Sequence, residues 1–238
     1  MKILFPLIIM SCFLLNCDDT TPIEPIEATQ PTTPVIPDTL FYLALGDSYT
    51  IGQSVAVSDR YSIQLQDSLS QSSINDKEID VKIIARTGWT TGDLQGSIDN
   101  DDDLRSNYDL VSLLIGVNNQ YQGRSLETYK IEFRQLLEKA ISLAGNKKNK
   151  VFVISIPDYA YTPFGNENTT VSQEIDEFNA ANKAITEEFG IRYFDITPIS
   201  REGLNDTELV ASDGLHPSGK QYNLWVKSFL EEIKNILF

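Results

Sequence analysis

Residues 41–48 read Phe-Tyr-Leu-Ala-Leu-Gly-Asp-Ser, an apolar run that ends in a glycine, an acid and a hydroxyl. The run has the length of one buried strand. The turn that follows holds Ser48 at the edge of the sheet to which such a strand would belong. Gly-Asp-Ser also forms ordinary turns. Any function for Ser48 therefore depends on what the rest of the chain brings to the same edge.

Apolar runs of the same kind recur along the chain and alternate with helical patterns. The expected strands are 40–45, 81–85, 109–115, 151–156 and 191–194, and the expected helices are 59–70, 125–145, 172–189 and a last helix that opens at Pro217. Repeated strand–helix units predict an α/β fold in which helices cover both faces of a parallel sheet. Ligands of such sheets bind beyond the carboxyl ends of the strands.

Polar or small residues follow four of these strands at that edge. Ser48 follows the first strand, Gly88 the second and Asn118 the third, while Asp213 and His216 follow the fifth. Because the carboxyl ends of parallel strands share one edge, we expect these segments to meet.

A serine hydroxyl becomes a nucleophile when a base accepts its proton, and that base is usually a histidine oriented by a carboxylate. His216 is the one histidine of the chain, and Asp213 precedes it by three residues in a glycine-containing turn. A lone histidine is often a residue without a catalytic role. Its place in Asp-Gly-Leu-His-Pro, before an amphipathic helix, favours the base.

An oxyanion needs preorganised hydrogen-bond donors. Ser48 and Gly88 have backbone N–H groups to offer, and Asn118 has its side-chain NH₂. Each glycine or asparagine is about equally well explained by turn formation when it is taken singly. Their joint order along the chain favours the oxyanion interpretation.

These blocks resemble those of the SGNH hydrolases, the GDSL-type lipases and esterases, over residues 41–236. The matching blocks are Gly46-Asp47-Ser48, Gly88, Gly116-x-Asn118 and Asp213-x-x-His216. The resemblance implies a three-layer α/β/α flavodoxin-like sandwich with five parallel strands and hydrolysis of acyl esters without a cofactor or metal. It also implies Ser48 as nucleophile, His216 as base, Asp213 as its orienter, and an oxyanion hole from Ser48, Gly88 and Asn118.

Two positions differ from the usual pattern of this family, and the substrate stays open. Tyr49 stands where Leu is common, and Asn119 stands where Asp is usual, so we expect Asn119→Asp to be neutral or mildly activating. The alternatives to a general esterase are a carbohydrate O-deacetylase and a noncatalytic glycan-binding lipoprotein. Tyr159, Tyr161 and Phe164 follow the fourth strand and form either an aromatic wall for the substrate or the packing of a long loop.

The first residues predict an exported, lipid-anchored protein. Lys2 precedes an apolar run over 3–15 that is too short to span a bilayer comfortably, and Leu14-Leu15-Asn16-Cys17 resembles a bacterial lipobox. We expect a signal peptide over 1–17, lipid on Cys17, a Pro/Thr-rich tether over 18–38, and the hydrolase domain over 39–238, held at the bacterial cell envelope. A simple secretory signal or a short buried helix are the alternatives.

Charge restricts the partners. The formal net charge is −15, which argues against nucleic acid and against electrostatic docking on anionic membranes. The acidic run 99–103 lacks the glycine and distant glutamate of a calcium-binding EF-hand loop, so we expect a solvated loop and no metal site. We expect a monomer that acts on a small-molecule or glycan ester.

Overall fold

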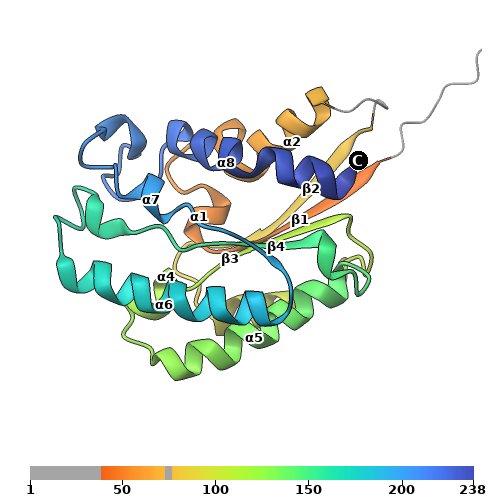
Figure 1. Ribbon diagram of the computed structural model, residues 1–238, viewed down its shortest axis with the longest axis horizontal. Helices are drawn as coiled ribbons and strands as arrows, with labels where there is room; N and C mark the ends of the chain where they lie inside the picture. The colour runs from red at the N-terminus through yellow and green to blue at the C-terminus, as the bar shows by residue number, and fades with distance from the viewer. Residues whose placement is uncertain (1–38, 73–76) are drawn as a thin grey trace, which may run out of the picture. The chain divides into compact units, whose positions relative to one another are not determined.

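The computed structural model describes residues 39–72 and 77–238, and its core is a five-stranded parallel sheet between helical layers (Figure 1). The strands are β1 (Leu40–Gly46), β2 (Ile79–Ala85), β3 (Leu110–Leu114), β4 (Val151–Ile154) and β5 (Arg192–Phe194), and they lie in the order β2-β1-β3-β4-β5. The expected α/β/α sandwich with five parallel strands is confirmed. The expected signal peptide 1–17 and tether 18–38 lie outside the described residues.

Helices cover both faces of the sheet. They are α1 (Ser48–Ile51), α2 (Tyr61–Ser72), α3 (Thr91–Asp99), α4 (Val117–Tyr121), α5 (Leu126–Leu143), α6 (Thr169–Glu188), α7 (Thr197–Ser200) and α8 (Gly219–Leu237). Helices α2 and α8 pack together on one face, and α5 packs between α3 and α6 on the other (Figure 1). No helix in the described part of the chain combines the length and hydrophobicity needed to cross a membrane.

The central strands are apolar because helices bury them from both sides. Every residue of β3 and β4 is buried, which is the pattern expected for the middle of a parallel sheet. The one polar side chain in β3, Ser112, is hydrogen-bonded to the hydroxyls of Tyr42 (2.8 Å) and Tyr61 (3.1 Å). These bonds join β1, β3 and α2 without leaving the hydroxyl unpaired.

Helix α5 confirms the sequence signals for its ends, whereas the last helix does not confirm its predicted start. Ser125 caps α5 by accepting a hydrogen bond from the Thr128 amide, and Gly145 follows its end with a φ of +66°. The last helix begins at Gly219 with Ser218 as its N-cap, so the prediction that Pro217 opens it is wrong. Pro217 instead forms a β-bridge with Val210, which fixes the loop that carries His216.

Four helices, α1, α3, α4 and α7, have no counterpart among the expected elements, and α1 and α7 span only four residues each. Helix α3 begins with a capping box, in which Thr90 and Asp93 bond each other's backbone amides. Its sequence signal is Thr-x-x-Asp before Leu94, but two glycines within the helix weaken the helical pattern. Helix α4 spans only five residues, too few for a periodic pattern.

Candidate active site

Ser48 stands at the carboxyl end of β1 as the first residue of α1. Asp47 caps this short helix, because its Oδ1 accepts a hydrogen bond from the Tyr49 amide at 3.0 Å. Position 46 must be glycine because there is no room for a Cβ atom, and not because of its backbone conformation. A Cβ atom there would lie 2.1 Å from Thr50 Oγ1 and 2.3 Å from the Leu114 carbonyl oxygen. The Gly-Asp-Ser motif therefore presses the turn that carries Ser48 tightly against the end of β3.

Gly88 and Asn118 lie on the next two loops, and both are fixed by hydrogen bonds. Gly88 has a φ of +86°, and its carbonyl accepts a hydrogen bond from Gln122 Nε2 at 3.3 Å. Asn118 Nδ2 donates to the Trp89 carbonyl at 3.0 Å, which ties the third block to the second. The Ser48 and Gly88 amides have no hydrogen-bond acceptor among residues 39–72 and 77–238. Both amides are thus free to bind an anionic oxygen.

Asp213 and His216 form a closed pair. His216 Nδ1 lies 2.6 Å from Asp213 Oδ2, while Asp213 Oδ1 accepts hydrogen bonds from the amides of Leu215 and His216, each at 3.0 Å. Burial alone would raise the pKa of Asp213, but hydrogen bonds from Ser54 and His216 outweigh it and hold that pKa well below its usual value. The carboxylate stays ionised, and its contact assigns the proton to Nδ1 of a neutral imidazole.

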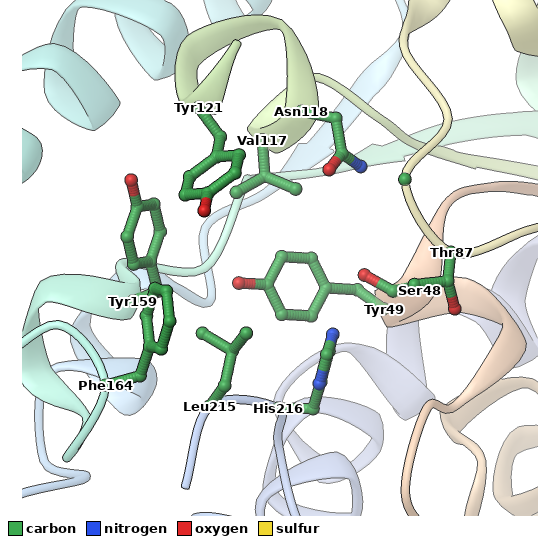
Figure 2. Close-up of a pocket in the computed structure, with 11 residues that line it drawn as sticks. Ser48, Tyr49, Thr87, Val117, Asn118, Tyr121, Tyr159, Phe164, Leu215 and His216 are labelled. Atoms are coloured by element: carbon green, nitrogen blue, oxygen red, sulfur yellow. The ribbon is translucent and has the colours of Figure 1, made fainter. Parts of the chain in front are cut away.

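The other ring nitrogen of His216 is therefore the one available to Ser48. In Figure 2 the upper nitrogen of the His216 ring points toward the Ser48 side chain. The described part of the chain contains no hydrogen bond between these two side chains. Bonds of this kind are often long in enzymes without substrate and tighten in the complex. Tyr49 supports the ring from the side, with centroids 5.8 Å apart and an edge-on angle of 62°.

These residues share one pocket of about 250 Å³ (Figure 2). Its lining consists of Ser48, Tyr49, Thr87, Gly88, Val117, Asn118, Tyr121, Tyr159, Phe164, Leu215 and His216. The Tyr49 ring lies in the middle of the pocket in Figure 2, with its hydroxyl directed toward the aromatic side chains at the far end. The pocket thus joins the candidate nucleophile and base to an aromatic compartment.

Three rings form that aromatic wall, and only two of them were predicted. Tyr159 and Phe164 line the pocket, and Tyr121 from α4 packs against both, with ring centroids 6.3 and 6.5 Å away. Tyr161 does not belong to the wall, because its ring packs under the guanidinium of Arg201 at 5.8 Å. No motif indicated Tyr121. The only sequence signal is its position three residues after Asn118, on a helix that was not expected.

The wall is held in place by a buried polar network. Tyr159 donates from its hydroxyl to Gln120 Oε1 at 3.0 Å. Asp158, which is wholly buried, accepts hydrogen bonds from the Ala160 amide, Ser172 Oγ and Arg201 Nε. A buried carboxylate with this many hydrogen-bond partners holds the surrounding chain in one conformation. The turn that carries Tyr159 is therefore preorganised.

Asn119 is a structural residue beside the site. Its side chain is buried, its Oδ1 accepts a hydrogen bond from the Thr91 amide at 3.0 Å, and its Nδ2 donates to Thr91 Oγ1 at 2.6 Å. The Thr91 hydroxyl in turn donates to Glu132. Asn119 therefore joins α4 to the start of α3. The side-chain NH₂ of Asn119 is needed because the Thr91 hydroxyl already donates its single proton to Glu132 and can only accept from Asn119.

Lysines pair with two of the four aspartates in the acidic run 99–103. Asp99 pairs with Lys139 at 2.8 Å, and Asp101 pairs with Lys82 at 2.9 Å. Within the described residues no three histidine, cysteine, aspartate or glutamate side chains are grouped as a metal ion requires.

The comparisons with known proteins agree with this fold. The family model of the GDSL-like lipases and acylhydrolases matches residues 44–224. Solved structures similar to this chain include the acetylxylan esterase of Geobacillus stearothermophilus, which is 24% identical with a TM-score of 0.63 and covers 83% of this chain and 95% of its own. A lipase/acylhydrolase of Enterococcus faecalis is 22% identical with a TM-score of 0.63, and the match covers 82% of this chain and 96% of the Enterococcus chain.

A lipolytic G-D-S-L family protein of Veillonella parvula is 20% identical with a TM-score of 0.61, and the match covers 81% of this chain and 97% of the Veillonella chain. No curated protein matches the sequence. Identities of this size show a shared fold, while the family model extends over most of the chain. The chain belongs to the GDSL-like lipase/acylhydrolase family of hydrolases.

Proposed function

We propose that this protein hydrolyses carboxylic acyl esters with Ser48 as nucleophile, His216 as general base and Asp213 as its orienting carboxylate. The observation that carries the proposal is the single pocket shared by Ser48, Gly88, Asn118 and His216, with Asp213 closed onto the far side of the imidazole. Four separate loops supply these groups. Their meeting has no explanation in packing alone.

The proposed reaction proceeds in two halves. Ser48 Oγ attacks the ester carbonyl as His216 accepts its proton, and the imidazolium then protonates the leaving alcohol. Water, deprotonated by His216, releases the acid and restores the hydroxyl. The Ser48 and Gly88 amides and Asn118 Nδ2 stabilise the oxyanion in both halves. Asn118 Nδ2 has two hydrogens, so its bond to the Trp89 carbonyl leaves one for the substrate.

Turnover of p-nitrophenyl acetate by the full-length protein tests this proposal. We expect Ser48→Ala and His216→Ala to remove activity, and the circular dichroism spectra should stay unchanged. Asp213→Ala should lose less than His216→Ala, because water can partly orient the ring. A His216→Ala protein with near-full activity would contradict the proposed base, and an inactive wild type would favour the noncatalytic glycan-binding alternative.

A second candidate is a carbohydrate O-deacetylase, in which the acyl group is acetyl and the alcohol is a glycan hydroxyl. Two exposed rings at the pocket, Tyr121 and Phe164, favour it, because aromatic faces suit the apolar faces of sugar rings. One neighbour is an acetylxylan esterase by its title. Rates on p-nitrophenyl esters of increasing length, measured beside acetylated and deacetylated glycans, separate the two. Preference for acetate and release of acetate from the glycan would support the deacetylase.

We also propose that a lipid on Cys17 anchors the protein in the bacterial cell envelope. The support is the apolar leader and the sequence Leu14-Leu15-Asn16-Cys17. Cys17→Ser should leave a protein that is unprocessed or released, and that no longer partitions into detergent as a processed lipoprotein. A processed Cys17→Ser protein that still partitions like the wild type would contradict the anchor.

A further inference from the structure

A short loop directly after the nucleophile helix contacts both of the other catalytic loops. Helix α1 ends at Ile51, and the chain turns at Gly52, where φ is +69°. The amide of the next residue, Gln53, donates to the Ser48 carbonyl at 3.0 Å. Gln53 and Ser54 are therefore fixed to the same turn as the nucleophile, and any contact that they make relates other groups to Ser48.

Ser54 contacts the carboxylate behind the histidine. Its Oγ donates to Asp213 Oδ2 at 2.7 Å, and that oxygen is the one that lies 2.6 Å from His216 Nδ1. The two residues are 159 positions apart in the chain. With Oδ1 bound to two backbone amides, the Ser54 bond leaves Asp213 little freedom to rotate away from the ring.

Ser54 makes this contact from an unfavourable backbone conformation. Its φ is +66°, in the left-handed region that a glycine adopts without penalty and a serine does not. Strain of this kind tends to be retained where a side chain serves a site. A glycine at position 54 would relieve the backbone but would remove the hydroxyl.

Gln53 makes the matching contact on the opposite side. Its Oε1 accepts a hydrogen bond from Thr87 Oγ1 at 2.6 Å. Thr87 lines the pocket and immediately precedes Gly88, whose amide is a proposed oxyanion donor. One hydrogen bond thus relates the position of this donor to the nucleophile turn.

We propose that Gln53 and Ser54 form a positioning clamp, in which Ser54 orients the Asp213 carboxylate and Gln53 orients the Gly88 loop relative to Ser48. The proposal rests on the proposed esterase function. Neither side chain lines the pocket, so both act through other residues. Their contribution is preorganisation: small displacements of catalytic groups reduce the rate steeply while substrate binding changes little.

The first test is Ser54→Gly, with Asn146→Gly as its matched control. Asn146 also has a positive φ, of +60°, but it lies after α5, away from the carboxyl ends of the strands. Both variants should melt at or above the wild-type temperature, because glycine suits the conformation. We expect kcat to fall roughly 10- to 100-fold in Ser54→Gly, with KM nearly unchanged, by analogy with the loss of partners that orient a catalytic ligand. Asn146→Gly should keep the wild-type kcat.

The pH profile separates positioning from a merely structural role. Without the Ser54 donor, the Asp213 carboxylate has more negative charge to offer to the imidazolium of His216. The acid limb of kcat/KM should therefore move to higher pH in Ser54→Gly. Because the chain has one histidine, the downfield Nδ1 proton resonance of an untagged protein is unambiguous, and it should shift in this variant.

Gln53 is tested by a pair of variants of similar size. Gln53→Leu removes the acceptor of the Thr87 hydroxyl and should lower kcat with the acid limb in place, because the histidine side of the site is untouched. Gln53→Glu keeps an acceptor oxygen and should restore most of the rate. Wild-type kcat and pH profile in both Ser54→Gly and Gln53→Leu would overturn the clamp. The activities of the wild type and of Ser48→Ala are compared before these variants are made. If the two are equal, the esterase proposal itself fails, and that failure is distinguished from failure of the clamp.

Discussion

Replacing Asp47 with asparagine should change how the stability of the protein depends on pH. The Asp47 side chain is wholly buried beside Ser48, and burial raises its pKa from 3.8 to about 7. Hydrogen bonds from the backbone of Tyr49 and Gly116 oppose this rise without cancelling it. Its Oδ2 has no hydrogen-bond partner among the described residues. The folded protein therefore favours the protonated acid.

The sign follows from linkage. Because the pKa of Asp47 is higher in the folded than in the unfolded chain, protonation stabilises the fold, and this stabilisation is complete below pH 3.8. It is lost as the pH rises through about 7. A shift of roughly three pH units corresponds to about 4 kcal/mol in all, of which about 2 kcal/mol is lost between about pH 5.5 and 8.

Urea unfolding of the wild type and of Asp47→Asn at these two pH values measures the effect. The free energy of unfolding of the variant, minus that of the wild type, should increase by about 2 kcal/mol from the lower to the higher pH. Using this difference cancels the titration of all other groups and any constant effect of the substitution. An unchanged difference would refute the reasoning and would show that Asp47 is ionised across this range.

The same variant identifies the group behind the acid limb of activity. If His216 is the base, kcat/KM should fall on the acid side with one ionisation in Asp47→Asn as in the wild type. Loss of that limb in the variant would assign it to Asp47 instead.

Three further substitutions test single contacts of the site. Asn118→Ala should lower kcat by about 10²–10³-fold with little change in KM, as expected for one oxyanion donor, whereas a change mainly in KM would assign Asn118 to substrate binding. Asn119→Asp should destabilise the protein by about 1–3 kcal/mol in thermal or urea unfolding, because a buried carboxylate cannot donate to Thr91 Oγ1, whose own proton is bound by Glu132; equal stability would contradict this account. Tyr49→Leu should raise kcat/KM for hexanoate relative to acetate esters roughly 10-fold, because it removes a ring from the pocket; an unchanged ratio would place the acyl chain elsewhere.

The strands and the site loops were predictable because each depends on local sequence. Buried parallel strands are continuous apolar runs, and the residues after Leu45 and Ile115 are a serine motif and an asparagine motif that the topology must bring together. The position of Pro217 was predicted less well. A proline before a helix resembles a helix start, but here Ser218 provides the cap and Pro217 pairs with Val210.

Contacts between distant segments carried no local signal. The Asn119 substitution illustrates this, since its expected neutrality rested on the family pattern alone. The structure shows that the Thr91 hydroxyl already donates its proton to Glu132 and therefore accepts a hydrogen bond from Asn119 Nδ2; Glu132 lies on α5, 41 residues after Thr91. In the same way, the bond between Ser54 and Asp213 depends on the closure of the whole sheet.

Covalent labelling of the full-length protein with a fluorophosphonate tests the central claim most directly. The account predicts one adduct per chain by intact mass, located on Ser48 by peptide mapping, with no adduct in Ser48→Ala and much slower labelling in His216→Ala. Labelling of Ser48→Ala at the wild-type rate, on Ser54 or any other serine, would contradict the assignment of Ser48 as the nucleophile.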